Sequence, residues 1–343
     1  MDKFSTLLST SDFQFGFKPN HSRKACVFAF KQIIEYYRSQ GSPVYVCYID
    51  ASKAFDHLNH WSLFKKLLDR KFPSVFDRLL FFWYANQHFI VQWGNSLSEK
   101  FNVTNGVWQG GILSPHFFNL YIDNLSTDLN ALKVGCNFNN VNVNHLVYAG
   151  GTGLLAPSLE ALQKLINCCL KYAHRYDIFY NKKKTVMMCI KPDHFKDLAV
   201  PKLFLGGDSI KLVEKKLSWL LINTGCLDNA DILRQVSGIY AHGNSLVKEF
   251  CSANEDVMLI LFKTYCSGFY CSSLWASYDS KCLQRFKVSY NNVFRKLFNI
   301  GCRESVSFNM TTRGTDAFPV IMHKYIVSFW KRFFIQLYYK QSV

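Results

Sequence analysis

The order of apolar and polar residues predicts a helix and then a buried strand near the start of the chain. Between residues 25 and 37, apolar side chains recur at helical spacing, at Val27, Phe30, Ile33, Ile34 and Tyr37. The next run, Pro43–Ile49, is continuous and rich in β-branched and aromatic residues. Such a run is typical of a strand that is covered on both faces, and this one ends on Asp50.

A similar pattern further along predicts a hairpin followed by a helix. Two short apolar runs, His145–Tyr148 and Gly153–Ala156, flank residues 149–152. Adjacent glycines in this connection tolerate the positive φ that tight hairpin turns require. Ser158 is a plausible N-cap, and the apolar stripe over 159–173 predicts a helix that packs against a sheet.

Three other segments have simpler patterns. Residues 61–91 are expected to be helical, and their many aromatic side chains to be core rather than a binding platform. A short hairpin is expected to turn at Gly206–Gly207. Beyond about residue 228 the pattern is helical throughout.

Composition narrows the class of protein. Among 343 residues, 49% are hydrophobic and 16% aromatic, which excludes intrinsic disorder. The net charge of +16 favours anionic partners. Residues 281–343 hold eleven Lys or Arg against two acids. Two interpretations of this region stay open, a solvated helix face and a surface that follows a nucleic-acid backbone.

Neither a secreted nor a membrane-spanning protein is expected. Residues 1–10 lack an apolar core of signal-peptide length, and the twelve cysteines show no CxxC pair. The uncharged stretch over 264–278 is too short to cross a bilayer. We therefore expect an intracellular protein, in the nucleus or cytoplasm, with reduced thiols.

Two segments are candidates for chemistry, while the phosphate loop, the nucleophile elbow and the zinc helix are absent. Asp50 ends an apolar strand, where α/β and α+β proteins often place polar site groups. Gly106–Pro115 contains three glycines that permit close backbone approach to a ligand, and its Ser114-Pro115 pair fits a helix start.

Taken together, these segments resemble the ordered motifs of reverse transcriptases. Tyr45–Asp56 resembles motif A, Gly106–Pro115 resembles motif B, and Leu146–Gly151 lies where motif C is expected. Asn181–Thr185 resembles motif D, and Gln14–Ser22 resembles a fingers segment. The most similar family is the reverse transcriptase of non-LTR (LINE-type) retrotransposons, in motif order and in spacing, from about residue 11 to about residue 310.

The resemblance implies an α+β, right-hand polymerase fold with a palm built on a small antiparallel sheet. The implied domains are partial fingers over 1–42, a palm with inserted fingers helices over 43–225, and a helical thumb with a basic C-terminal region over 226–343. It also implies an RNA-directed DNA polymerase that acts on an RNA and DNA primer–template with two Mg²⁺ ions.

The resemblance also implies roles for individual residues. Asp50 would be the catalytic motif A acid that bridges both metal ions. Phe55 would be the steric gate beneath the sugar of the nucleotide, and Lys184 would lie near its triphosphate. Gln109 and Gly110 would lie along the template and the nascent base pair.

Motif C departs from the family pattern. Gly150 and Gly151 stand where the family has two aspartates, and glycine cannot ligate Mg²⁺. Asp56 and Asp177 are spare acids that nothing in the sequence places at the hairpin. Two smaller departures are Trp108, where the family usually has Arg, and Gly153, where it usually has an apolar or β-branched residue.

These departures leave four hypotheses. The first is a reverse transcriptase domain that has lost catalysis, with weak or no Mg²⁺ binding. The second is a nucleic-acid-binding module without catalysis. The third is the product of a decayed element with no cellular role. The fourth is a domesticated polymerase with substitute metal ligands.

Overall fold

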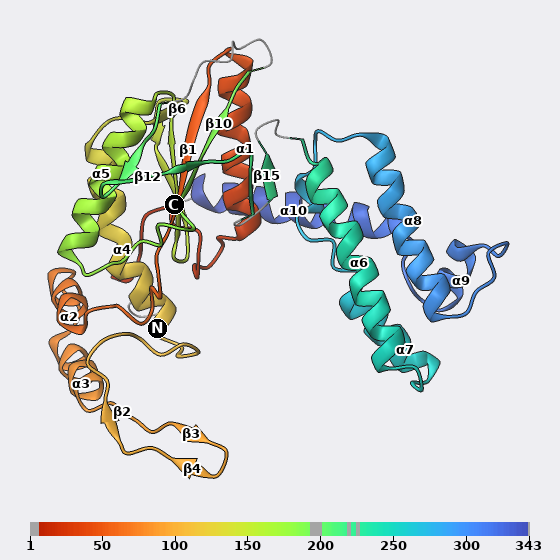
Figure 1. Cartoon of the computed structure of the whole chain (residues 1–343), viewed down its shortest axis with the longest axis horizontal. Helices are drawn as coiled ribbons and strands as arrows, with labels where there is room; N and C mark the ends of the chain where they lie inside the picture. The colour runs from red at the N-terminus through yellow and green to blue at the C-terminus, as the bar shows by residue number, and fades with distance from the viewer. Residues whose placement is uncertain (1–6, 193–200, 218–220, 224–226, 342–343) are drawn as a thin grey trace. The chain divides into compact units, whose positions relative to one another are not determined.

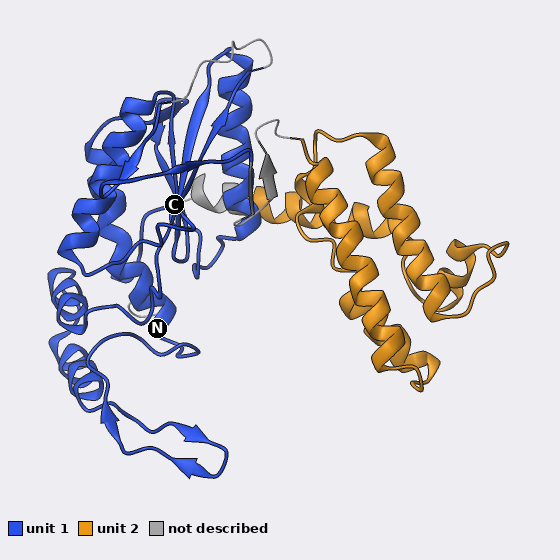
Figure 2. Ribbon diagram, in the orientation of Figure 1, with its two compact units in different colours: residues 1–214 blue, residues 215–343 orange. Residues whose placement is uncertain are grey.

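The chain forms two compact units, residues 1–214 and residues 215–343 (Figure 2). The computed structural model describes residues 7–192, 201–217, 221–223 and 227–341. The predicted boundary between residues 225 and 226 falls on residues outside this described part. In the first unit, the 1–42 segment belongs to the same compact body as the sheet.

The first unit is built on a five-stranded sheet in the order β13-β10-β1-β9-β8. The central strand β1 (Val44–Asp50) pairs antiparallel with β10 (Val186–Ile190) and with β9 (Gly151–Ala156). The edges are β8 (His145–Tyr148) and β13 (Lys211–Leu212), of which β13 runs parallel to β10. Residues of β1 are buried on both faces, so the predicted covered strand is confirmed.

Helices pack on both faces of this sheet (Figure 1). On one face lie α4 (Ser114–Ala131) and α5 (Leu159–Arg175), whose apolar side chains form one core with Cys47 and Ile49 of β1. On the other face lies α1 (Arg23–Ser39). Neighbouring β1 residues point to opposite faces, and Tyr48 accordingly contacts the ring of Phe30 in α1 at a centroid distance of 6.3 Å.

The β8–β9 hairpin forms as predicted, but its positive φ is not on a glycine. Tyr148 pairs with Gly151, so the turn consists of Ala149 and Gly150. Ala149 has φ 51°, while Gly150 lies outside the left-handed region. In this register Gly150 is the second turn residue and Gly151 already belongs to β9, so the first turn position falls on Ala149. The predicted turn at Gly206–Gly207 does put glycines at positive φ, 60° and 93°.

The segment predicted as one aromatic core is two helices and a projecting β-arm. Helix α2 (His60–Asp69) buries Leu63, Phe64 and Leu67, in agreement with the prediction. Helix α3 (Ser74–Ala85) contradicts it, because only Asp77 and Tyr84 are buried there. The α3 side chains that were expected in the core are exposed: Phe81 44%, Phe82 67% and Trp83 46%. One face of α3 packs on α2, and Trp83 meets the ring of Trp108 in the motif B loop edge-on at a centroid distance of 5.3 Å.

The arm follows α3 and returns to motif B. Its strands are β2 (His88–Phe89), β3 (Gln92–Trp93), β4 (Ser96–Leu97) and β5 (Phe101–Asn102), with β2 paired to β5 and β3 to β4. Two further hairpins lie outside the five-stranded sheet. Between α4 and β8 is β6–β7 (Cys136–Phe138 and Val141–Val143), and between β10 and β13 is β11–β12 (Phe204–Leu205 and Asp208–Ser209).

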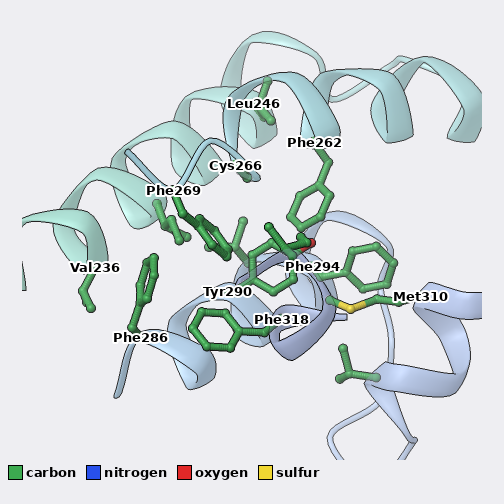
Figure 3. Close-up of a cluster of buried hydrophobic side chains, with 14 of the residues drawn as sticks. Val236, Leu246, Phe262, Cys266, Phe269, Phe286, Tyr290, Phe294, Met310 and Phe318 are labelled. Atoms are coloured by element: carbon green, nitrogen blue, oxygen red, sulfur yellow. The ribbon is translucent and has the colours of Figure 1, made fainter. Parts of the chain in front are cut away.

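The second unit is mainly helical, as predicted beyond residue 228. A short hairpin, β14–β15 (Lys215–Leu217 and Leu221–Asn223), precedes the helices. The helices are α6 (Asn229–Glu249), α7 (Glu255–Tyr265), the 3₁₀ turn η2 (Ser272–Leu274), α8 (Ser280–Leu297), α9 (Val306–Thr312) and α10 (Phe318–Gln341). Aromatic rings dominate its core, around Phe262, Phe269, Phe286, Tyr290 and Phe318 (Figure 3). In the described residues no helix is both long and apolar enough to cross a membrane.

Candidate polymerase site

Asp50 lies at the end of β1, directly beside the motif C hairpin. It is paired in register with Gly151, and the Ala51 amide donates to the carbonyl oxygen of Gly150 at 3.0 Å. The Asp50 side chain is 39% exposed. Motifs A and C therefore meet as the resemblance implies, with one carboxylate at their junction.

Gly150 has room for a side chain. A Cβ atom there would lie 3.4 Å from Cβ of Ala54 and 3.9 Å from Cβ of Ala51, which are ordinary van der Waals distances. Its backbone is outside the left-handed region, so an L-residue meets no conformational penalty of the kind that favours glycine. The backbone would thus accept the carboxylate that the family carries at this position.

Lys184 forms an ion pair with Asp50. Its Nζ lies 3.3 Å from Oδ2 of Asp50. The turn that carries Lys184 is tied to the end of β1, because the Asn181 amide donates to the Asp50 carbonyl oxygen at 2.8 Å. The Asn181 side-chain oxygen then accepts from the amides of Lys183 and Lys184, both at 3.1 Å. The predicted motif D lysine is therefore held against the motif A acid.

The two spare acids have partners away from Asp50. Asp56 Oδ1 accepts a hydrogen bond from Nε2 of Gln109 at 3.2 Å. Asp177 Oδ2 accepts from Nδ2 of Asn59 at 3.5 Å. Among the described residues, no group of three or more His, Cys, Asp or Glu side chains is placed to hold a metal ion. Mg²⁺ needs near-octahedral oxygen ligands, and the residues present do not fit that requirement.

Phe55 lies on the α4 side of this junction in a small stack of rings. Its ring stacks on that of Phe118 at a centroid distance of 4.9 Å. The ring of Phe17, from the fingers segment, meets Phe55 edge-on at 5.9 Å. Sequence reasoning assigned Phe55 alone, because the pattern carries no sign that residues 17 and 118 approach it.

The motif B loop lines an open groove of about 710 Å³, which also involves the base of the arm. The Gly106 backbone packs so closely on residue 56 that a Cβ would lie 2.8 Å from the Asp56 carbonyl oxygen. Gly110, at φ 93°, has open space around it. Of these glycines, Gly106 therefore serves packing within the chain, whereas Gly110 faces the groove. The loop ends where α4 begins at Ser114, as predicted.

The fingers segment completes the edge of the sheet, a role that the sequence did not reveal. Residues 13–15 run alongside β8, with the Phe15 amide donating to the Val147 carbonyl oxygen at 2.8 Å. Buried Gln14 donates from Nε2 to Oδ1 of Asn119 in α4 at 2.9 Å. A Cβ at Gly16 would lie 2.3 Å from the Ala149 nitrogen. The motif C turn is therefore buttressed from the N-terminal side.

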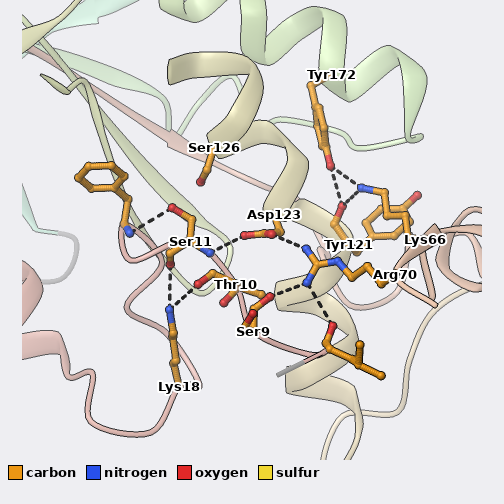
Figure 4. A network of polar contacts seen from close by, with 12 residues as sticks. Ser9, Thr10, Ser11, Lys18, Lys66, Arg70, Tyr121, Asp123, Ser126 and Tyr172 are labelled. Atoms are coloured by element: carbon orange, nitrogen blue, oxygen red, sulfur yellow. Dashed lines mark hydrogen bonds and ion pairs between the residues drawn. The ribbon is translucent and has the colours of Figure 1, made fainter. Parts of the chain in front are cut away.

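A polar network beneath this region ties the N-terminal segment and α2 to α4 (Figure 4). Asp123 accepts from the Ser11 amide at 2.7 Å and pairs with Arg70. The ammonium group of Lys66 donates to the Tyr172 hydroxyl at 2.6 Å and lies 3.8 Å from the ring centroid of Tyr176. Burial lowers the pKa of Lys66 to about 7.

Comparisons with known proteins identify the family of the chain and similar folds. The family model described as reverse transcriptase (RNA-dependent DNA polymerase) matches residues 3–222. The chain is 27% identical over 178 residues to the retrovirus-related Pol polyprotein from type-2 retrotransposable element R2DM of Drosophila melanogaster. That match covers 51% of this chain and 17% of the polyprotein.

Among solved structures, apo telomerase from Candida tropicalis matches with a TM-score of 0.50 at 12% identity, over 92% of this chain and 50% of that one. Telomerase from Candida albicans in complex with a fragment of telomeric RNA gives a TM-score of 0.46 at 13% identity, over 90% and 56% of the two chains. The first supports the right-hand polymerase fold. With the family match over most of its length, the chain belongs to the reverse transcriptases and is similar to the reverse transcriptase domain of non-LTR retroelements.

Proposed function

We propose that this reverse transcriptase domain binds a primer–template of RNA and DNA but does not polymerise. The observation that carries the proposal is the junction of motifs A and C, where glycines replace both motif C acids and Lys184 forms an ion pair with Asp50. The family is generally metal-dependent, and this junction offers one carboxylate that already has a counter-ion.

Substitute ligands are the competing interpretation, and the contacts of the spare acids argue against it. Asp56 accepts a hydrogen bond from Gln109, and Asp177 accepts one from Asn59. Either acid would have to give up its partner to reach Asp50. We infer weak or absent Mg²⁺ binding at this site.

Binding of nucleic acid is supported by charge and by the open groove beside motif B. The net charge of +16 favours a polyanion, and the groove contains Gln109 and Gly110. Such a partner places the protein in the nucleus or cytoplasm, where RNA and DNA are available. A decayed element product without a cellular role is distinguished from such a binding module by whether the transcript and the protein are detected in the source tissue.

Primer extension on an RNA template tests the loss of polymerisation. With Mg²⁺ or Mn²⁺ and all four deoxynucleotides, we expect no extension above that of an Asp50→Ala control, because one ion-paired carboxylate cannot organise two metal ions. Extension by the wild type that is abolished in Asp50→Ala would disprove the proposal.

Restoring the two acids tests whether the metal site is the missing part. We expect the double variant Gly150→Asp and Gly151→Asp to bind Mn²⁺ more tightly than the wild type, measured by electron paramagnetic resonance, because residue 150 has space for the side chain. Adding Asp50→Ala to the double variant is the control and should remove the gain. Unchanged Mn²⁺ affinity in the double variant would show that more than the motif C acids has been lost.

A further inference from the structure

The arm, defined here as residues 88–102, displays large apolar side chains to solvent. Its exposed fractions reach 85% for Trp93, 68% for Leu97, 54% for Ile90 and 53% for Val91. Because burying such side chains would stabilise the protein by about 25 cal/mol per Å², leaving them exposed carries a cost. A protruding group of this kind is typical of a binding surface.

The arm is a hairpin held by hydrogen bonds between its two sides. Its outer strands close through the pairs Gln92–Leu97 and Trp93–Ser96, around a turn that begins at Gly94 with φ 59°. Midway, the Val91 amide donates to the Ser98 hydroxyl at 2.9 Å. Trp93 is the last residue of β3, directly before the turn that joins β3 to β4 at the end of the hairpin (Figure 1).

The charge of the arm distinguishes among kinds of partner. Its ionisable residues are His88, Glu99 and Lys100, so its net charge is zero with neutral His. An arm built to hold phosphates or an anionic lipid surface would carry an excess of Lys and Arg. Flat aromatic faces beside neutral amide and hydroxyl groups suit unpaired nucleobases, since every base has a face on which a ring can stack.

The base of the arm is continuous with the groove beside motif B. Phe89 lines that groove together with Trp108, Gln109 and Gly110. The ring centroids of Phe89 and Phe101 are 6.3 Å apart, and those of Phe89 and Trp108 are 6.4 Å apart. Aromatic rings thus lead from the groove onto the arm.

We propose that the arm binds the unpaired bases of a single-stranded RNA or DNA template as the strand passes to or from the groove, with a base stacked on Trp93. The proposal rests on the proposed binding of a primer–template. It adds an interaction through bases on a hairpin that carries no net charge.

The test compares Trp93→Ala with the wild type by fluorescence anisotropy, using a labelled 20-nucleotide single-stranded RNA and a blunt duplex of the same length. We expect affinity for the single strand to fall about 5- to 100-fold, the range for removal of one base–aromatic stacking interaction. The dependence of affinity on salt should stay unchanged, because no phosphate interaction is removed. Duplex affinity should change less than about twofold, and Trp93→Phe should keep most of the single-strand affinity, since a ring remains.

Trp61→Ala is the matched control. Trp61 is also a tryptophan of the first unit, is 72% exposed, and does not line the groove. Its replacement should leave single-strand affinity within about twofold of the wild type, since no base is expected to stack there. An equal loss of affinity in both variants would overturn the assignment to the arm.

The remaining outcomes separate this inference from the proposed function. If the wild type binds primer–template and Trp93→Ala binds the single strand equally well, the arm inference fails while the proposed function stands. If the wild type binds no nucleic acid, the proposed function fails, and the arm inference, which rests on it, fails with it. If Trp93→Ala instead abolishes self-association in sedimentation or binding to phosphatidylcholine vesicles, with RNA affinity unchanged, the inference is overturned in favour of a protein or membrane partner.

Discussion

At the motif C turn, residues 150 and 151 are glycines, and the backbone hydrogen bonds of the turn are formed. The Ala51 amide still donates to the Gly150 carbonyl oxygen, and Asp50 still pairs with Gly151. Two neighbouring carboxylates without a metal would repel each other, so glycine removes that electrostatic cost together with the metal ligands. At the scale of the residue, the turn therefore forms without an acidic side chain at either position.

The titration of His145, the first residue of β8, is a test at the same scale. Its ring is fully buried between Asn144 Oδ1, at 2.6 Å, and Ser126 Oγ, at 2.8 Å. Burial lowers the pKa of His145 to about 4 from 6.5. Between pH 6.5 and pH 4 the unfolded state therefore binds a proton at His145 more readily than the folded state does. The contribution of the buried neutral ring to the free energy of unfolding is complete above pH 6.5 and is lost as the pH falls toward 4.

We expect the wild type to lose about 3 kcal/mol more free energy of unfolding than His145→Gln between pH 7 and pH 4. Urea unfolding of both proteins at several pH values measures this difference, and glutamine keeps one donor and one acceptor at the site. An NMR titration of the wild-type imidazole is an independent check. A ring that titrates near pH 6.5 in the folded protein would contradict the assigned burial effect.

At the scale of the element, the close packing of α6 against α8 in the second unit depends on one glycine. Gly243 of α6 faces Val293 of α8, and a Cβ at residue 243 would lie 2.5 Å from Cγ1 of Val293. Real Cβ atoms do not approach other atoms this closely, so the two helices would have to move apart. Because α6 and α8 share the aromatic core of Figure 3, that separation would loosen packing around Tyr290.

We expect Gly243→Ala to lower the free energy of unfolding by about 1–3 kcal/mol, the usual cost of overpacking a core. Gly238→Ala is the control on the same helix, where no atom lies within 4 Å of the added Cβ. Alanine is the better helix former, so this control should raise stability by about 0.5–1 kcal/mol. Thermal unfolding of Gly243→Ala and Gly238→Ala measures the two changes in stability. Adding Val293→Ala to Gly243→Ala should restore part of the lost stability. Equal effects at the two glycines would contradict the packing argument.

At the scale of the whole molecule, the net positive charge favours a polyanionic partner such as nucleic acid. The net charge of +16 is spread over both units, with eleven Lys or Arg against two acids in residues 281–343. Each phosphate that a cation neutralises releases a counterion, which makes affinity fall steeply with salt. Two interpretations of the C-terminal charges, a solvated face and a phosphate-binding face, therefore predict different salt dependences.

Replacing two exposed cations of α8 decides between these interpretations. If they bind phosphates, the double variant Lys281→Gln and Arg285→Gln should lower the slope of log affinity against log salt by about 1 for each phosphate that is no longer bound. Primer–template affinity at several salt concentrations measures this slope. Lys65→Gln, an exposed lysine of the first unit, serves as the comparison. An unchanged slope in the double variant would establish a solvated face.

The sequence by itself determined the parts of the molecule that follow from local patterns. The continuous apolar run that ends at Asp50 became β1, and the stripe after Ser158 became α5. That Asp50 meets motif C was implied only by the family resemblance, and the strand pairing places Asp50 opposite Gly151. These features can be predicted because the spacing of side chains along a strand or helix decides which of them are buried.

Only the tertiary structure decided which distant groups meet. It put the positive φ on Ala149, paired Lys184 with Asp50, and bonded Gln109 to Asp56. It also left Phe81, Phe82 and Trp83 of α3 exposed, where the aromatic run over 61–91 had predicted a core. The sequence pattern indicates how apolar a segment is, whereas its burial depends on whether another element covers it. Pairings between residues far apart in the sequence form only when the chain has folded.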